Sequence, residues 1–418
     1  MQPAPGRAPR TSVVVVSRHR PQHLALCLAA LARQTHPEHE IVLVADPETV
    51  GICPDLPLKR RAFDIANISQ ARNEGIALAA APVLAFIDDD AIAFPGWLEA
   101  LSAPFADPRV LAATGFTRGP DGLHWQARAE RMTPSGRALP FDLPFDLGET
   151  ALLGPENGHP VSTIGTNCAF RRDALLEIGG FDPAFPYHLD ESDVNMRMAA
   201  HFPKALTAVV PQAQVVHGIA PGTGRAAFGV PQDLTPIGRS AAIFAARHGG
   251  DAGWMLAGQR RRLLRHMVAG RLDPFAVAPL LATLQTGLSQ GRGLCPPPPP
   301  HWGHAAPPDF QPMPPGPMPP GAIHPGAGRH VFLAGWHWRA GGLRQTAAGL
   351  VAKGDMATIL LMTPSVQPHR LVMTDGGWWE QRGGLWGPSQ PGDRAVMLMG
   401  WTRRCARERG NSLDLSPK

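Results

Sequence analysis

The first 120 or so residues alternate short apolar runs, rich in β-branched side chains, with longer stretches whose apolar residues recur at helical spacing. Residues 12–17 (SVVVVS) and 41–45 (IVLVA) have the composition of buried strands. Between them, residues 21–34 begin with a proline and place three leucines on one helical face. This alternation is typical of a parallel sheet with helices packed on it. We therefore predict that the chain begins with an α/β domain.

A third apolar run, residues 83–87, leads directly into Asp88, Asp89 and Asp90. In open α/β sheets, ligands bind beyond the carboxyl ends of the strands. On an extended segment, Asp88 and Asp90 can both face one hard divalent cation, Mg²⁺ or Mn²⁺, whereas the side chain of Asp89 points away. The same triplet is also typical of a solvated turn or a helix cap. The acidic cluster alone therefore leaves a metal site and a simple turn as alternatives.

Composition excludes several other classes of protein. The longest apolar runs are far shorter than the roughly 18 residues of a membrane-spanning helix, and the N-terminus lacks the apolar core of a secretory signal, so we expect a cytoplasmic location. Five scattered cysteines without a CxxC pair argue against a disulfide framework or a zinc site. A net charge of +5 is compatible with phosphate-bearing ligands or an anionic membrane surface, but does not indicate nucleic acid.

The chain divides into four predicted parts. A catalytic domain over residues 11–245 precedes a helical extension over 246–293. Residues 294–328 form a linker, because 14 prolines lie between Pro296 and Pro325, a composition that favours extended chain over a packed core. Residues 329–418 are expected to form a small α/β unit, an accessory or degenerate module. Six of the ten tryptophans lie in this unit, where core packing is favoured over sugar stacking.

Residues 259–271 interleave five arginines with leucine, methionine and valine, so a helix there is basic and amphipathic. Peripheral contact with an anionic membrane, such as the inner face of the cytoplasmic membrane, is one interpretation. The favoured alternative is a solvated helix whose leucines pack on the catalytic domain.

Four further segments occur in a fixed order around the acidic triplet: residues 68–75 (ISQARNEG), 165–172 (GTNCAFRR), 179–182 (GGFD) and 190–197 (DESDVNMR). In this order they resemble the family 2 type of glycosyltransferase with the GT-A fold. The resemblance spans roughly Ser12 to Arg239. It implies a Rossmann-like mixed sheet flanked by helices that binds a nucleotide-diphosphate sugar.

The resemblance also implies a metal site and a catalytic base. Asp90 would be the direct metal ligand, Asp88 would contact the metal or the ribose, and a histidine at the position of His217 often completes the site. Glu191 falls where the family places its base, although Asp190 departs from the usual first acid of that motif. Asp190 and Asp193 are alternatives for the base. Asp193 also has a structural explanation, an ion pair with Arg197 one helical turn away.

The resemblance further suggests residues that bind the two substrates. Those expected to bind the donor are Ser17, Arg18, Asp46, Arg72, Asp88 and Asp89. Arg72 would hold the diphosphate because a guanidinium matches phosphate oxygens in a bidentate fork. Asn167 and Trp97 are expected to border the donor or acceptor sugar. For Trp97, packing in the core is an equal alternative.

We therefore predict a metal-dependent, inverting glycosyltransferase that moves a sugar to a hydroxyl of a glycan or a lipid-linked acceptor in polysaccharide or cell-envelope biosynthesis. Inversion follows from the resemblance alone. Nucleotidyl transfer is a competing enzyme class, but the segment after the first strand, residues 17–21 (SRHRP), lacks the glycines typical of it. A third hypothesis is a catalytically weak nucleotide-binding scaffold that recruits partners through its proline-rich linker.

Overall fold

The computed structural model describes residues 8–143, 148–222, 224–303, 306–313, 329–390 and 392–413. Within these residues, ten strands form one mixed sheet in the order β10-β12-β6-β11-β4-β1-β2-β3, with β5 paired to β12 and β7 to β6. Its strands are β1 (Thr11–Ser17), β2 (His39–Ala45), β3 (Lys59–Ala62), β4 (Val83–Asp88), β5 (Ala91–Ala93), β6 (Val110–Arg118), β7 (Trp125–Ala127), β10 (Ala151–Leu153), β11 (Cys168–Arg171) and β12 (Leu206–His217). A separate hairpin joins β8 (Glu130–Met132) and β9 (Ala138–Pro140).

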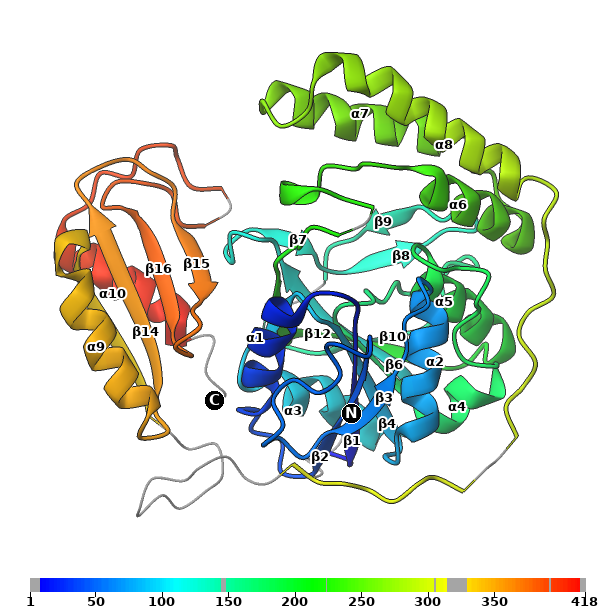
Figure 1. Cartoon of the computed structure of the whole chain (residues 1–418), viewed down its shortest axis with the longest axis horizontal. Coiled ribbons are helices and arrows are strands. Elements are labelled where there is room, and N and C mark those ends of the chain that lie inside the picture. The colour runs from blue at the N-terminus through cyan, green and yellow to red at the C-terminus, as the bar shows by residue number, and fades with distance from the viewer. Residues whose placement is uncertain are drawn as a thin grey trace.

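Helices cover both faces of this sheet because neighbouring residues of its central strands point to opposite sides. Val13 and Val15 of β1 pack in one apolar cluster, whereas Val14 packs in another. The first cluster is covered by α1 (Pro21–Leu31) and α3 (Trp97–Ser102), and the second by α2 (Ile68–Leu78), α4 (Arg172–Glu177) and α5 (Asp190–His201). Figure 1 shows the two groups of helices on either side of the sheet. The predicted mixed α/β fold with flanking helices is confirmed.

The sequence pattern predicts a strand near residues 162–170 and a helix through residues 193–200, and both differ in length from the observed elements. The strand expected near residues 162–170 is shorter, because the Asn167 N–H donates to the Ile164 carbonyl (2.7 Å) and closes a turn before β11 begins. The helix expected from Asp193 begins three residues earlier, so that Asp190 and Glu191 lie in the first turn of α5. Negative side chains there are stabilised by the helix dipole.

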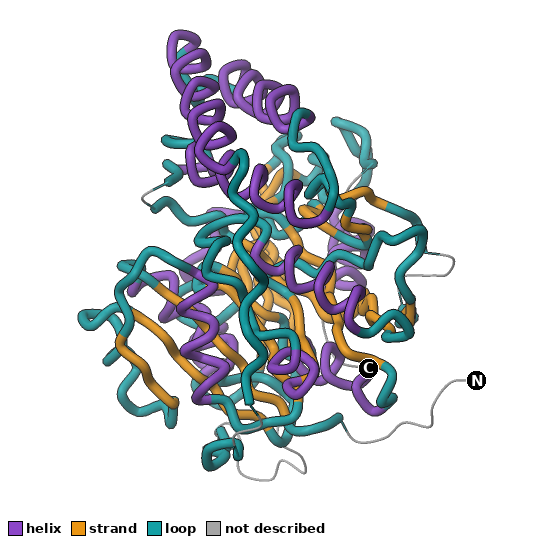
Figure 2. The backbone as a smooth tube through the Cα atoms, turned by 90° about the vertical axis from the view of Figure 1, so that its right-hand side faces the viewer, coloured by secondary structure: helices purple, strands orange, loops and turns teal. Residues whose placement is uncertain are grey.

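A helical extension follows β12 and comprises α6 (Thr235–His248), α7 (Trp254–Val268) and α8 (Val277–Gly291). Their buried apolar residues form one cluster with Phe185 and Leu189, the residues that lead into α5. Figures 1 and 2 both show α7 and α8 side by side at one end of the molecule. None of the helices in the described parts of the chain is long and apolar enough to cross a membrane.

The described half of the proline-rich segment is bound to the catalytic domain and is not a free linker. The Trp302 N–H donates to the Leu176 carbonyl (3.0 Å), and the Met313 N–H donates to the His39 carbonyl (2.8 Å). Met313 is only 6% exposed and joins the apolar cluster beneath α1. Figure 1 shows the yellow trace of residues 294–303 and 306–313 running along the outside of the domain. The rest of the predicted linker, residues 314–328, lies outside the described residues.

The C-terminal residues form a second, smaller α/β unit, as the sequence predicts. Four strands pair in the order β13-β14-β16-β15, and two helices pack on them. Its elements are β13 (His330–Trp336), α9 (Ala340–Val351), β14 (Met356–Thr363), β15 (Arg370–Met373), β16 (Trp379–Gly384) and α10 (Trp401–Leu413). The unit docks on the catalytic domain where Trp379 stacks on Phe94 (4.7 Å between ring centroids) and the Leu371 N–H donates to the Asp121 carbonyl (2.7 Å).

Candidate metal and donor site

Three of the predicted residues come together at the carboxyl end of β4. Asp88, Asp90 and His217 each offer one ligand atom, and these atoms all lie within 4.8 Å of one another. Asp88 is the last residue of β4, and His217 is the last residue of β12. They meet because β5, directly after the acidic triplet, pairs antiparallel with β12 and places Ala91 opposite His217. A long-range strand pairing therefore assembles the cluster.

The chemistry of this cluster fits a divalent cation. Asp90 Oδ1 and His217 Nε2 lie 3.3 Å apart, and both atoms are buried without a hydrogen-bond partner among the described residues. The other atoms of both side chains are occupied, since Asp90 Oδ2 accepts from the Ala220 N–H (2.7 Å) and His217 Nδ1 contacts Gln126 Oε1 (3.1 Å). Unpaired buried polar atoms are costly, and a carboxylate facing an imidazole is a donor set that suits Mn²⁺ or Mg²⁺.

Two cationic side chains that sequence reasoning missed lie beside the cluster. Arg225 Nη2 donates to Asp90 Oδ2 (2.8 Å), and Arg20 Nη1 lies 3.6 Å from the same oxygen. Burial alone would raise the pKa of Asp90, but His217 and Arg225 outweigh it and hold that pKa well below its usual range. Arg20 follows the first strand in the segment that lacks glycine. Arg225 lies in an irregular loop, where no periodicity identifies it.

Asp89 points away from the metal cluster and toward the end of β1. Its carboxylate accepts from Ser17 Oγ (2.7 Å) and from Arg20 Nη1 (2.9 Å), and only 3% of the residue is exposed. Burial and the neighbouring charge of Asp90 raise the pKa of Asp89 to about 6, although Arg20 and Ser17 oppose the rise. The predicted donor residues Ser17 and Asp89 therefore bind each other, and both line the edge of the sheet next to the cluster.

The remaining predicted donor residues of the first two strands lie at the same edge. Asp46, after β2, accepts from the backbone N–H of His19 (2.7 Å) and of Thr49 (3.1 Å), and these bonds lower the pKa of Asp46 against the opposing effect of burial. Arg18 extends outward and pairs with Asp64 (2.7 Å). Asp46 thus stabilises the loop that follows β1, while Arg18 is partly exposed at this edge of the sheet.

Arg72 joins the metal cluster to the first turn of α5. Its guanidinium donates to Asp190, to Asp88 (3.1 Å) and to the Gly165 carbonyl (3.1 Å). A Cβ at Gly165 would lie 2.7 Å from Arg72 Nη2, so only glycine allows this approach. Burial would lower the pKa of Arg72, but Asp190 and Asp88 raise it, and the side chain is almost fully enclosed. Both terminal nitrogens of Arg72 donate to protein oxygens, so the side chain links the end of β4 to the first turn of α5.

Glu191 carries a carboxyl group whose pKa is strongly raised. Burial and the adjacent charge of Asp190 raise the pKa of Glu191 to about 8, and Arg72 opposes the rise. Its Oε1 accepts from Ser192 Oγ (3.2 Å). A pKa near the working pH is suited to accepting a proton. Because Arg72 binds both Asp88 and Asp190, it holds the first turn of α5 close to the metal cluster.

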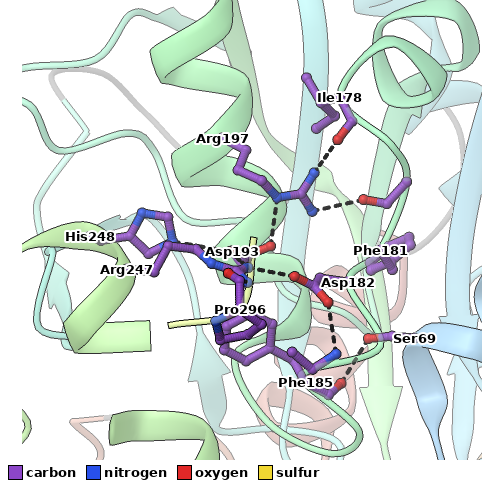
Figure 3. A network of polar contacts seen from close by, with 12 residues as sticks. Ser69, Ile178, Phe181, Asp182, Phe185, Asp193, Arg197, Arg247, His248 and Pro296 are labelled. Atoms are coloured by element: carbon purple, nitrogen blue, oxygen red, sulfur yellow. Dashed lines mark hydrogen bonds and ion pairs between the residues drawn. The ribbon is translucent and has the colours of Figure 1, made fainter. Parts of the chain in front are cut away.

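Asp193, an alternative for the base, lies in a separate ion-pair network (Figure 3). It accepts from Arg197 (2.7 Å) at Oδ2, and from Arg247 (2.9 Å) and His248 (3.0 Å) at Oδ1. Arg247 also pairs with Asp182 (2.7 Å). Burial opposes these contacts, yet they lower the pKa of Asp193 to about 2. Both oxygens are bound by cations, which favours the structural explanation over the catalytic one.

The two residues predicted to border a sugar are enclosed in the core. Trp97 and Asn167 are both 0% exposed. Trp97 Nε1 donates to Asn167 Oδ1 (2.8 Å), and Asn167 Nδ2 donates to the carbonyls of Phe116 (3.0 Å) and Ala213 (2.9 Å). Every polar atom of the Asn167 side chain is thus satisfied within the sheet. Neither side chain reaches a surface on which an acceptor could bind, so we assign both a structural role.

One family model matches the N-terminal part of the chain. The model described as Glycosyl transferase family 2 matches residues 12–179, a range that contains Asp88 and Asp90 and ends before Glu191 and His217. This match agrees with the resemblance seen in the sequence, and the mixed sheet with its flanking helices confirms the predicted α/β fold class.

A curated relative matches a share of the chain similar to that matched by the family model. The chain is 30% identical over 184 residues to the glucosyl-dolichyl phosphate glucuronosyltransferase of Haloferax volcanii. The match covers 41% of this chain and 56% of the relative, so the chain spans about half the length of that protein.

Solved structures show weaker likeness. A structure of GalNAc-T7 with UDP, GalNAc and Mn²⁺ is 16% identical, with a TM-score of 0.43, and covers 57% of this chain and 48% of its own. The mannosyltransferase PcManGT of Pyrobaculum calidifontis, in complex with GDP-Man and Mn²⁺, is 19% identical, with a TM-score of 0.39, and covers 70% of this chain and 79% of its own.

Proposed function

We propose, from the match of the Glycosyl transferase family 2 model to residues 12–179, that the protein transfers a sugar from a nucleotide-diphosphate donor to an acceptor hydroxyl, with inversion at the sugar carbon. The observation that carries the proposal is the Asp88, Asp90 and His217 cluster, whose unpaired buried atoms face one another. Family membership supports the reaction class, and the cluster supports the metal dependence.

In this proposal, Asp88, Asp90 and His217 hold Mn²⁺ or Mg²⁺ at the carboxyl end of β4. The bound cation would neutralise negative charge on the diphosphate leaving group. Arg20 and Arg225 lie next to Asp90 and supply further positive charge at the same place. Ser17, Asp46 and Asp89 shape the adjoining edge of the sheet, where the nucleoside part of the donor would bind.

Glu191 acts as the base that takes the proton from the acceptor hydroxyl as that oxygen attacks the sugar carbon. The attack and the departure of the diphosphate occur on opposite sides of the carbon, which gives inversion. Arg72 fixes Asp190, the neighbour of Glu191, and so sets the position of the base relative to the donor. The raised pKa makes the Glu191 carboxylate a stronger proton acceptor, and it acts as the base in the molecules in which it has lost its own proton.

We further propose a lipid-linked acceptor and a site of action at the inner face of the cytoplasmic membrane. The name of the Haloferax volcanii relative refers to a dolichyl phosphate, which supports an acceptor of this class. The scaffold hypothesis receives less support, because the described half of the proline-rich segment is bound to the catalytic domain at Trp302 and Met313.

The first experiment is a thermal-unfolding panel of UDP, GDP, dTDP and CDP, each with and without Mn²⁺. Binding to the folded state raises the unfolding temperature. We expect one nucleotide to give a shift that requires Mn²⁺ and disappears in Asp90→Asn. Sugar transfer is then assayed with the matching donor, for the wild type and for Glu191→Gln. Absence of any nucleotide shift would contradict the transferase proposal and favour a non-catalytic role.

A further inference from the structure

Positive charge is concentrated in the α7–α8 hairpin, residues 254–291. This stretch contains five arginines and one acidic residue, Asp273, and therefore carries a net charge of +4, against +5 for the whole chain of 418 residues. None of these arginines forms an ion pair with another described residue. The pKa of His266 is lowered by burial and by the charges of Arg262, Arg271 and Arg265, as expected where positive charge is uncompensated.

The exposed face of α7 carries these charges in ordered rows. Residues four apart lie on the same side of a helix. One row begins at Arg260 and continues through Leu264 to Val268, and the adjacent row contains Arg261 and Arg265. All five residues are exposed. The opposite face of α7 is buried against α8 and α6, so only the arginine-bearing face and the tip remain available to a partner.

The tip of the hairpin exposes two apolar side chains beside the arginines. Val268, the last residue of α7, is 82% exposed, and Phe275, just before α8, is 89% exposed. The turn between them is ordered, because Asp273 Oδ1 accepts from the Phe275 N–H (2.8 Å). Phe275 is therefore held outward by a defined turn, and nothing in the described parts of the chain covers it.

We propose that the tip of the α7–α8 hairpin docks on an anionic lipid bilayer, with Val268 and Phe275 entering the interface and Arg260, Arg261 and Arg265 binding lipid phosphates. Arginines around exposed apolar residues are typical of surfaces that bind the membrane interface. A nucleic acid would bind the same charges and stack a base on Phe275, but it would gain little from the exposed Val268. The combination therefore favours the bilayer.

The hairpin is connected directly to the loop that follows the metal cluster. Arg262 Nη2 donates to the Gly229 carbonyl (2.7 Å), and the Arg271 guanidinium lies over the Phe228 ring (4.7 Å to its centroid). This loop also supplies Arg225, which binds Asp90. Docking of the hairpin would thus bring this loop, and with it the metal cluster, toward the membrane surface. The docking itself depends on no catalytic step and holds even if the transferase proposal fails.

The test is flotation of the full chain with vesicles of phosphatidylcholine alone, and with vesicles in which about one third of the lipid is phosphatidylglycerol. We expect binding to the anionic vesicles only, weakened by salt. The triple variant Arg260→Gln, Arg261→Gln, Arg265→Gln should lose about fivefold in affinity per arginine, on the order of a hundredfold in all. Phe275→Ser should weaken binding about tenfold.

Matched controls come from the C-terminal unit. Arg370, Arg394 and Arg403 are also exposed, and the triple change of these residues to Gln removes the same charge elsewhere. Leu398, 87% exposed, is the apolar control for Phe275 through Leu398→Ser. All changed residues are on the surface, so unfolding temperatures should match the wild type. Equal losses in the controls, strong binding to neutral vesicles, or binding to heparin but to no vesicle would each overturn the proposal.

Discussion

His217 Nε2 lies 3.3 Å from Asp90 Oδ1, and neither of these buried atoms has a hydrogen-bond partner in the described parts of the chain. The imidazole is aimed at the carboxylate by Gln126, whose Oε1 contacts His217 Nδ1 (3.1 Å) from β7. Such outer partners fix the orientation and the tautomer of a metal-binding histidine. Residues of β7 and β12, which lie far from β4 in the sequence, thus meet at the end of β4.

The first prediction concerns Gln126. Its replacement in Gln126→Ala should lower the affinity for Mn²⁺ by about 10- to 100-fold, because the His217 ring loses its orienting contact. Isothermal titration of Mn²⁺ in the presence of the bound nucleotide measures the effect. Gln212→Ala, an exposed glutamine of β12 that contacts only the Gly148 carbonyl, is the control. Unchanged Mn²⁺ affinity in Gln126→Ala would argue against His217 as a ligand.

The second prediction concerns Glu191 and pH. A base with a raised pKa is protonated below that pKa, so kcat/KM should increase with pH as Glu191 loses its proton, toward a plateau above about 8 in the absence of other changes. A bound cation nearby would move the rise to lower pH. Glu191→Gln should abolish transfer and leave nucleotide binding intact. A variant that keeps substantial transfer and the same pH profile would move the role of base to Asp190.

The third prediction concerns the stability of the fold in acid. Asp193 has a pKa of about 2 in the folded chain against 3.8 for the ordinary group, so its contribution is complete above about pH 4 and is lost as the pH falls toward 2. The loss amounts to about 2 kcal/mol of the free energy of unfolding. Urea unfolding at a series of pH values measures it.

The variant Asp193→Asn provides the comparison for this measurement. It should be less stable at neutral pH by about 3 kcal/mol, because Arg197 and Arg247 lose a buried partner. Its stability should also depend less on pH between 4 and 2. An identical acid profile in the variant and the wild type would show that other carboxylates control acid unfolding.

The fourth prediction separates core packing from acceptor binding at Trp97. Trp97→Phe removes the N–H that Asn167 Oδ1 accepts, and should cost about 1–3 kcal/mol of unfolding free energy. KM for donor and acceptor should stay close to the wild-type values. Trp338→Phe, at a tryptophan that is 67% exposed, should leave stability unchanged. A raised KM for the acceptor with unchanged stability would instead support the sugar-binding interpretation of Trp97.

Local patterns in the sequence predicted the elements well where the pattern was regular. The runs that became β1, β2 and β4 are apolar along their whole length and are bounded by turn residues, so their nature and ends follow from the chain alone. The proline-rich composition likewise predicted extended backbone. It could not show that residues 294–313 bind the catalytic domain, because that contact depends on carbonyls of distant residues, such as those of Leu176 and His39.

The sequence by itself determined that Asp88 and Asp90 stand at the end of a buried strand, since a short apolar run bounded by acidic residues is typical of one. Only the tertiary structure decided which residues meet them. The pairing of β5 with β12 brings His217 to Asp90, and the loop after β12 brings Arg225. Arg72 of α2 meets Asp190 of α5 and so links Asp88 to Asp190. The physical reason is that periodicity and composition specify local conformation and burial, whereas the partner of a buried charge is chosen by contacts between distant segments.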